Sequence, residues 1–118
     1  MKGIRAVALV LVIVGLASGL AGGDPQHGEP QSVGATCGAA HADVSWAPVV
    51  DPHLEGYDIY ERADGESGYS VANGELVTST GYRVTGLATG VAYEFRVVAV
   101  YTDGHKSDMS APASCTTG

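Results

Sequence analysis

The chain has 118 residues, which leaves room for one ordinary domain and no second hydrophobic core once the first twenty or so are set aside as a removable leader. It carries thirteen acidic and six basic residues, and without Lys2 and Arg5 of the leader the formal charge falls from −7 to −9. Because phosphate binding needs a basic surface, this balance argues against nucleic acid as a partner.

Residues 1–21 have the three parts of a secretory signal peptide. Lys2 and Arg5 supply a positive start, residues 6–16 (AVALVLVIVGL) an apolar run, and residues 17–21 (ASGLA) small side chains at cleavage spacing. The apolar stretch is shorter than the roughly 20 residues that a membrane-spanning helix needs. We therefore expect a secreted or extracytoplasmic protein, attached to a membrane only if the leader stays uncleaved.

Residues 22–33 (GGDPQHGEPQSV) are rich in Gly, Pro and Gln and have no apolar periodicity. Such a segment buries too little surface to order itself, so we predict a flexible linker. The folded domain is then expected over residues 34–118.

From His41 onward, short alternating segments are separated by turn residues, which is typical of a half-buried antiparallel sheet. The first clear strand is predicted over residues 42–46, with Ala42, Val44 and Trp46 pointing inward. Asn73-Gly74 suits a tight hairpin turn between two weaker strands. The further strands are expected at residues 57–62, 69–71, 76–77, 82–85, 92–101 and 107–115.

Three stretches together carry a family resemblance: residues 44–48 (VSWAP), 54–60 (LEGYDIY) and 84–97 (VTGLATGVAYEFRV). They look like a fibronectin type III domain read from its second strand to its sixth. The resemblance implies an all-β fold, an immunoglobulin-like antiparallel β-sandwich of about seven strands with fibronectin type III topology. The chain departs from the family in its first strand, where residues 32–40 (SVGATCGAA) are small.

The resemblance also implies a set of core residues. Leu87, followed six residues later by Tyr93, is similar to the family's tyrosine corner, in which the tyrosine hydroxyl bonds to backbone upstream. Trp46 corresponds to the family's core tryptophan, and Tyr57 lies on the inward phase of its strand. We therefore expect Trp46, Tyr57, Leu87 and Tyr93 in the core.

Cys37 and Cys115 are the two cysteines of the chain, and an exported protein meets an oxidising compartment in which a pair can persist as a disulfide. In the resemblance, the last strand ends at the pole where the first two strands are joined, which implies a bridge between Cys37 and Cys115. A redox or metal-binding role is the alternative, but the sequence has neither the Cys-x-x-Cys spacing nor the neighbouring cluster of histidines that would support it.

The sequence has no recognisable catalytic or metal-binding pattern. Its histidines lack the paired spacing of zinc ligands, and the common nucleotide-binding, serine-hydrolase and zinc-protease motifs do not occur. The histidines are His27, His41, His53 and His105. Acidic pairs such as Asp51 with Glu55 are interpreted as solvated loop carboxylates rather than as calcium sites. We expect no enzyme activity, no cofactor and no metal.

One face of the predicted strands 57–62 and 92–101 points outward and carries an apolar stripe with flanking cations, a pattern that can mark an association site. The candidate binding residues are Tyr60, Arg62, Arg96, Val98 and Val100. The sequence thus predicts a non-catalytic extracellular interaction or spacer module that binds a protein or glycan partner. The alternatives are a structural subunit of a surface or fibre assembly and an accessory piece of a separately encoded hydrolase. The sequence indicates no oligomeric state.

Overall fold

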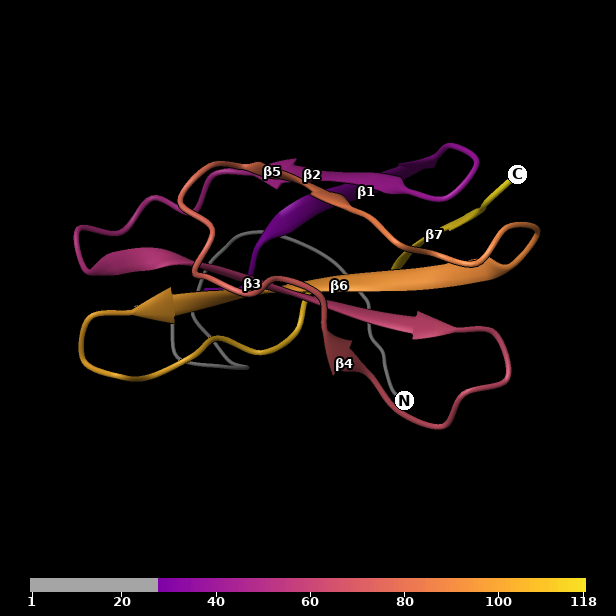
Figure 1. The fold of residues 1–118 in the computed structure, drawn as a ribbon. Helices are drawn as coiled ribbons and strands as arrows, with labels where there is room; N and C mark the ends of the chain where they lie inside the picture. Colours follow the sequence, from indigo (N-terminus) through magenta and orange to yellow (C-terminus); the bar gives the residue numbers. More distant parts are fainter. Residues whose placement is uncertain (1–27) are drawn as a thin grey trace.

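The computed structural model describes residues 28–118, which form seven strands in two antiparallel sheets (Figure 1). The strands are β1 (Gln31–Cys37), β2 (Ala42–Ala47), β3 (Leu54–Ala63), β4 (Ser70–Val71), β5 (Gly81–Val84), β6 (Ala92–Tyr101) and β7 (Ala113–Thr116). One sheet has the order β1-β2-β5 and the other β4-β3-β6-β7, so the predicted sandwich is confirmed. The signal peptide expected at residues 1–21 lies outside the described residues. The part described has no helix able to cross a membrane.

The sandwich begins earlier than the sequence predicts. β1 starts at Gln31, before the expected boundary at residue 34, and Pro30 ahead of it is fully buried. The Tyr101 hydroxyl donates a hydrogen bond to the Gly28 carbonyl over 2.9 Å. The prediction of a flexible linker is therefore wrong for residues 28–33. Their partners lie on distant strands, a stabilisation that local composition does not reveal.

β2 shows the predicted alternation. Ala42, Val44 and Trp46 are buried, whereas Asp43 and Ser45 are exposed, because successive side chains of a strand point to opposite faces. The inward residues join the core with those of β3 and β6, the central pair of the four-stranded sheet. Across the core, the main contributors from that pair are Tyr57, Ile59, Tyr93, Phe95, Val97, Ala99 and Tyr101.

Two buried tyrosine hydroxyls accept hydrogen bonds from backbone N–H groups. The Tyr93 hydroxyl accepts a hydrogen bond from the Ala88 N–H over 2.9 Å, which is the geometry of a tyrosine corner. The Tyr57 hydroxyl accepts one from the Val49 N–H over 3.0 Å. Leu87 is buried next to the corner. These bonds satisfy polar atoms that would otherwise weaken the core.

The hairpin predicted at Asn73-Gly74 is not formed. The segments on either side of it both pair with β3 instead of with each other: Val71 lies opposite Tyr60, and Val77 forms an isolated bridge with Tyr57. Between these two contacts the Asn73 side chain replaces a backbone partner. Its Oδ1 accepts from the Ile59 N–H over 2.8 Å. Asn73 is buried by this role, whereas a hairpin turn would leave it exposed.

The last strand is shorter than predicted. β7 covers residues 113–116. The segment before it is joined to β6 by separate hydrogen bonds and does not form a regular ladder with it. In this segment Ser107 and Ser110 donate their N–H groups to the Ala99 and Val97 carbonyls, each over 2.9 Å. Pro112 has no N–H and cannot continue a ladder, so regular pairing begins only after it.

Candidate functional site

The outward face of the four-stranded sheet brings together most of the candidate binding residues. The register of β3 and β6 sets Tyr60 opposite Arg96 and Arg62 opposite Glu94. Residues directly opposed across an antiparallel pair have their Cβ atoms about 4.5–5.5 Å apart, close enough for their side chains to interact. The outward face is therefore polar and charged where these two pairs lie, and the hydrogen bonds of their side chains determine how it is arranged.

Tyr69, just before β4, is the centre of this arrangement. The guanidinium carbons of Arg62 and Arg96 lie 5.5 and 5.4 Å from the centroid of its ring, within the range of cation–π interactions. Its hydroxyl donates to a Glu94 carboxylate oxygen and accepts a hydrogen bond from Arg96 Nε over 2.9 Å. We call these four residues, Arg62, Tyr69, Glu94 and Arg96, the Arg–Tyr cluster.

Both arginines of the cluster are held at several points. Arg62 Nη2 donates to Glu94 Oε1 over 2.8 Å and its Nη1 to the Glu66 carbonyl over 3.0 Å. Arg96 Nη1 donates to the Ser110 carbonyl over 3.4 Å. The side chains of Arg62 and Glu94 keep about a third of their surface exposed. The cluster is thus ordered before any ligand arrives and still open to solvent.

The charge state of the cluster follows from these contacts. The bond from Tyr69, helped by Arg62, holds the pKa of Glu94 below its usual value. Burial, followed by the bond to Glu94, raises the pKa of the Tyr69 phenol. At neutral pH the cluster therefore combines a carboxylate, a neutral phenol and two guanidinium groups. The neutral Tyr69 phenol donates a hydrogen bond to the Glu94 carboxylate and so helps to hold it in place.

Lys106 extends the same face. Its Nζ lies 3.3 Å from Asp58 Oδ2, and Asn73 Nδ2 donates to the other oxygen of that carboxylate over 3.0 Å. The bond to Asp58 and the nearby Tyr60 raise the pKa of Lys106. Tyr60 and Val100 are half-buried on this face. Tyr60 and Val100 therefore point outward, as predicted, and lie beside the Lys106–Asp58 ion pair.

Val98 requires a correction. It points outward, but only 3% of its surface is exposed, so it offers no apolar contact to a partner. On one side it faces Asp58 across β3, and on the other the segment between Ser107 and Ser110 runs beside it. The alternation of β6 correctly predicted that Val98 points outward. It could not show that residues 107–110 cover the Val98 side chain.

Within residues 28–118 no three His, Cys, Asp or Glu side chains lie close enough to hold a metal ion. The Asp51 and Asp103 carboxylates each accept the N–H of the histidine two residues on, over 2.8 and 2.9 Å. A pocket of about 120 Å³ next to Arg62 and Glu94 is smaller than the roughly 300–1,000 Å³ typical of sites for small molecules.

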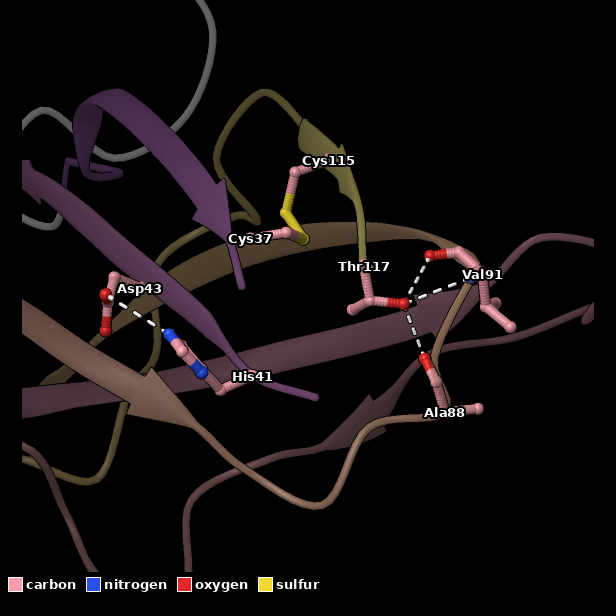
Figure 2. The surroundings of a disulfide bond; sticks show 7 residues. All are labelled: Cys37, His41, Asp43, Ala88, Val91, Cys115 and Thr117. Atoms are coloured by element: carbon pink, nitrogen blue, oxygen red, sulfur yellow. Dashed lines mark hydrogen bonds and ion pairs between the residues drawn. A yellow bond between two sulfur atoms is a disulfide. The ribbon is translucent and has the colours of Figure 1, made fainter. Parts of the chain in front are cut away.

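The cysteines form the bridge that the resemblance implied. Cys37 and Cys115 are joined as a disulfide with their Cα atoms 5.6 Å apart (Figure 2). Close to the bridge, Thr117 is buried and accepts the Val91 N–H over 3.1 Å, and its hydroxyl donates to the Ala88 carbonyl. The bridge therefore lies in a well-bonded part of the chain, at the pole where β1 turns into β2.

A model of the fibronectin type III domain family matches residues 28–116. The chain belongs to this family. The match begins at the first described residue, consistent with the early start of β1. The matched range includes both cysteines of the Cys37–Cys115 bridge and all four residues of the Arg–Tyr cluster.

Three known proteins are similar to this fibronectin type III domain. Over 57 residues, 45% of this chain, the sequence is 47% identical to Exoglucanase A of Cellulomonas fimi, but that match covers only 6% of the enzyme. An Fn3-like protein from Clostridium thermocellum is 25% identical with a TM-score of 0.66, covering 79% of this chain and 95% of that one. The FN5 domain of Drosophila Lar is 29% identical with a TM-score of 0.62, covering 78% and 98%.

Sequence reasoning missed Tyr69, Glu94 and Lys106 as parts of the site. Tyr69 follows Gly68 in a stretch without clear alternation, so its direction could not be assigned. The signal that was present is chemical: a tyrosine in a polar loop that follows a strand with Glu61 and Arg62 near its end. Tyrosine and arginine are enriched where proteins bind one another.

Proposed function

We propose that this fibronectin type III domain is a non-catalytic extracellular interaction or spacer module that binds a protein or glycan partner through the outer face of its four-stranded sheet. The observation that carries the proposal is the Arg–Tyr cluster. Its side chains are fixed by mutual hydrogen bonds and remain partly exposed. Binding to a preorganised surface loses less side-chain entropy than binding to a flexible one.

The distribution of charge also supports this face as the binding surface. Residues 28–118 are strongly acidic and hold four cations, and three of them gather on this face: Arg62, Arg96 and Lys106. The fourth, Arg83, pairs with Asp43 on the other sheet. Guanidinium groups and tyrosine rings recognise both the polar groups of proteins and the hydroxyl groups of sugars.

An extracellular location is part of the proposal. Disulfides persist in oxidising compartments and are rare in the cytosol, and the Cys37–Cys115 bridge ties together strands from both sheets. The signal peptide expected from residues 1–21 would deliver the chain there.

The similarity to part of an exoglucanase favours a more specific role, that of an accessory module acting beside an enzyme that degrades glucans. In this version the partner of the outer face is the glucan or the enzyme itself. A separately encoded catalytic protein would supply the chemistry.

Binding measurements with matched variants test the proposal. The domain is applied to insoluble cellulose, to soluble glucans and to extracellular proteins of the producing cell, and the bound fraction is compared with those of Arg96→Ala, Tyr69→Ala and Arg83→Ala. We expect a partner that is lost with the first two substitutions and kept with Arg83→Ala, which lies on the other sheet. Equal binding by all variants would show that the binding site lies elsewhere on the domain. If the domain bound none of the glycans or proteins, the interaction role would be contradicted.

A further inference from the structure

The disulfide encloses the hydrophobic core in a covalent ring. Cys37 is the last residue of β1 in one sheet, and Cys115 belongs to β7 in the other, 78 positions later in the sequence. The residues of the core cluster run from Ala42 to Tyr101, so all of them lie inside this ring. Outside it, the described chain has only residues 28–36 and 116–118.

This connectivity fixes the path of a mechanical load. A pull on the two ends of the sandwich passes along β1 to Cys37, crosses the S–S bond and leaves through Cys115. The residues between the cysteines are bypassed, because the shorter covalent path carries the tension. Forced unfolding of a domain depends on how fast the loaded contacts give way. Here the residues of the core cluster lie on the bypassed path, and the loaded contacts with them are those of β1, whose Val33 and Ala35 pack against the cluster.

The segments that do carry load have little length to release. β1 pairs with β2 from Gln31 opposite Ala47 to Cys37 opposite Ala42. A strand already rises about 3.3 Å per residue, close to the limit of about 3.3–3.6 Å for a fully extended chain. Apart from the irregularity between Gln31 and Gly34, where Ser32 has a φ of 57°, pulling β1 free of β2 therefore lengthens it only slightly.

The exit at the other end is short and anchored. The Thr117 hydroxyl bonds to the Val91 and Ala88 backbone (Figure 2). The Gly118 N–H donates to the Gly38 carbonyl over 3.0 Å. The loaded path thus enters along an extended strand and leaves next to the bridge.

We propose that the Cys37–Cys115 disulfide makes this module a nearly inextensible mechanical link, one that transmits tension between its ends without unfolding. The inference deepens the spacer half of the proposed function and rests on it. It makes no use of the Arg–Tyr cluster, so loss of partner binding and loss of load bearing are separate outcomes.

Single-molecule stretching of the full chain, with handles fused to its two ends, tests the inference. We expect the oxidised protein to show no unfolding step. Dithiothreitol then opens the bridge by thiol–disulfide exchange, in which the cystine gains two protons and two electrons and the reagent becomes a cyclic disulfide. The 78 positions between the cysteines should add about 26–28 nm to the extended length, as a step or, if the reduced domain is already unfolded, as a longer chain from the start.

A second attachment point shows whether the applied force is sufficient. Thr78 is exposed and lies inside the ring. With handles at Thr78 and at the C-terminal end, the oxidised protein should unfold in one step, after which residues 78–115 span about 12–13 nm. The step equals this reach minus the separation of the two residues in the folded domain.

Two results would overturn the inference. One is a step of 26–28 nm in the oxidised protein pulled from its ends. The other is a reduced protein that gives no added length when pulled from its ends at forces that unfold the domain through Thr78.

Discussion

Trp46 and Tyr57 pack edge to face across the two sheets, with ring centroids 5.2 Å apart and planes inclined by 65°. Trp46 comes from β2 of the three-stranded sheet and Tyr57 from β3 of the four-stranded sheet. The edge of one aromatic ring carries partial positive charge and the face of the other partial negative charge, so this geometry is attractive. The pair therefore links the two sheets within the core.

The first prediction removes one ring of this pair. Trp46→Ala should lower the free energy of unfolding by about 3–5 kcal/mol, because it deletes a buried aromatic side chain and leaves a cavity. Urea denaturation followed by circular dichroism measures the change. Val50→Ala is the matched control, since Val50 is 96% exposed and should change the stability by less than about 0.5 kcal/mol. A Trp46→Ala protein as stable as the control would mean that the tryptophan does not support the core.

The sequence was most informative where local pattern and tertiary packing agree. β6 has the predicted bounds because no Gly or Pro interrupts its ten residues, and β2 alternates as expected. Prediction failed where long-range partners decide the structure. β1 is ordered by pairing with β2, and Asn73 is buried because it bonds to Ile59, fourteen residues away.

The sequence predicted which strand residues of the candidate site point outward, but not which other residues complete the site. Alternation along β3 and β6 gave the outward face correctly for Tyr60, Arg62 and Arg96. It could not show that Tyr69 folds back between the arginines, because that depends on the path of the loop from β3 to β4. For the same reason it could not show that the segment before β7 closes over Val98.

The second prediction concerns the tyrosine corner. Tyr93→Phe removes the acceptor for the Ala88 N–H and should cost about 1–3 kcal/mol, since a backbone donor loses its partner. Thermal or chemical denaturation measures the difference. Tyr82→Phe provides the comparison, because Tyr82 is a half-buried tyrosine of β5 that is not part of the corner. If both variants lost the same stability, the corner bond would contribute nothing specific.

The third prediction concerns the bridge at equilibrium. Reduction of Cys37–Cys115 should lower the free energy of unfolding by about 2–4 kcal/mol, because it restores freedom to a long loop of the unfolded chain. Melting the protein with and without reducing agent measures this. Any partner held by the Arg–Tyr cluster should still bind to the reduced domain while it remains folded, since the cluster is formed by β3, β6 and Tyr69. A melting temperature unchanged by reduction would show that the bridge adds no stability.

The last prediction is a pH dependence located in the Arg–Tyr cluster. The pKa of Glu94 is lower in the folded protein than in the unfolded chain because Tyr69 and Arg62 bond to the carboxylate. A carboxylate with a lowered folded pKa stabilises the fold above its unfolded pKa, and that contribution is lost as the pH falls through the folded value. Between neutral pH and about pH 3, the wild type should therefore lose more stability than Glu94→Gln, which has no carboxylate to protonate.

Comparison of the wild type with Glu94→Gln separates the contribution of Glu94 from those of the other acidic residues. Burial raises the pKa of Glu29 and Glu61, so their contributions have the opposite sign, favouring the fold at low pH, but both variants share them. Melting temperatures measured from pH 7 to pH 3 should converge as Glu94 of the wild type becomes protonated. Parallel curves, with a constant gap between wild type and Glu94→Gln, would show that the Glu94 carboxylate has the same pKa in the folded and unfolded chains. In that case the bonds from Tyr69 and Arg62 would not hold the cluster together in solution.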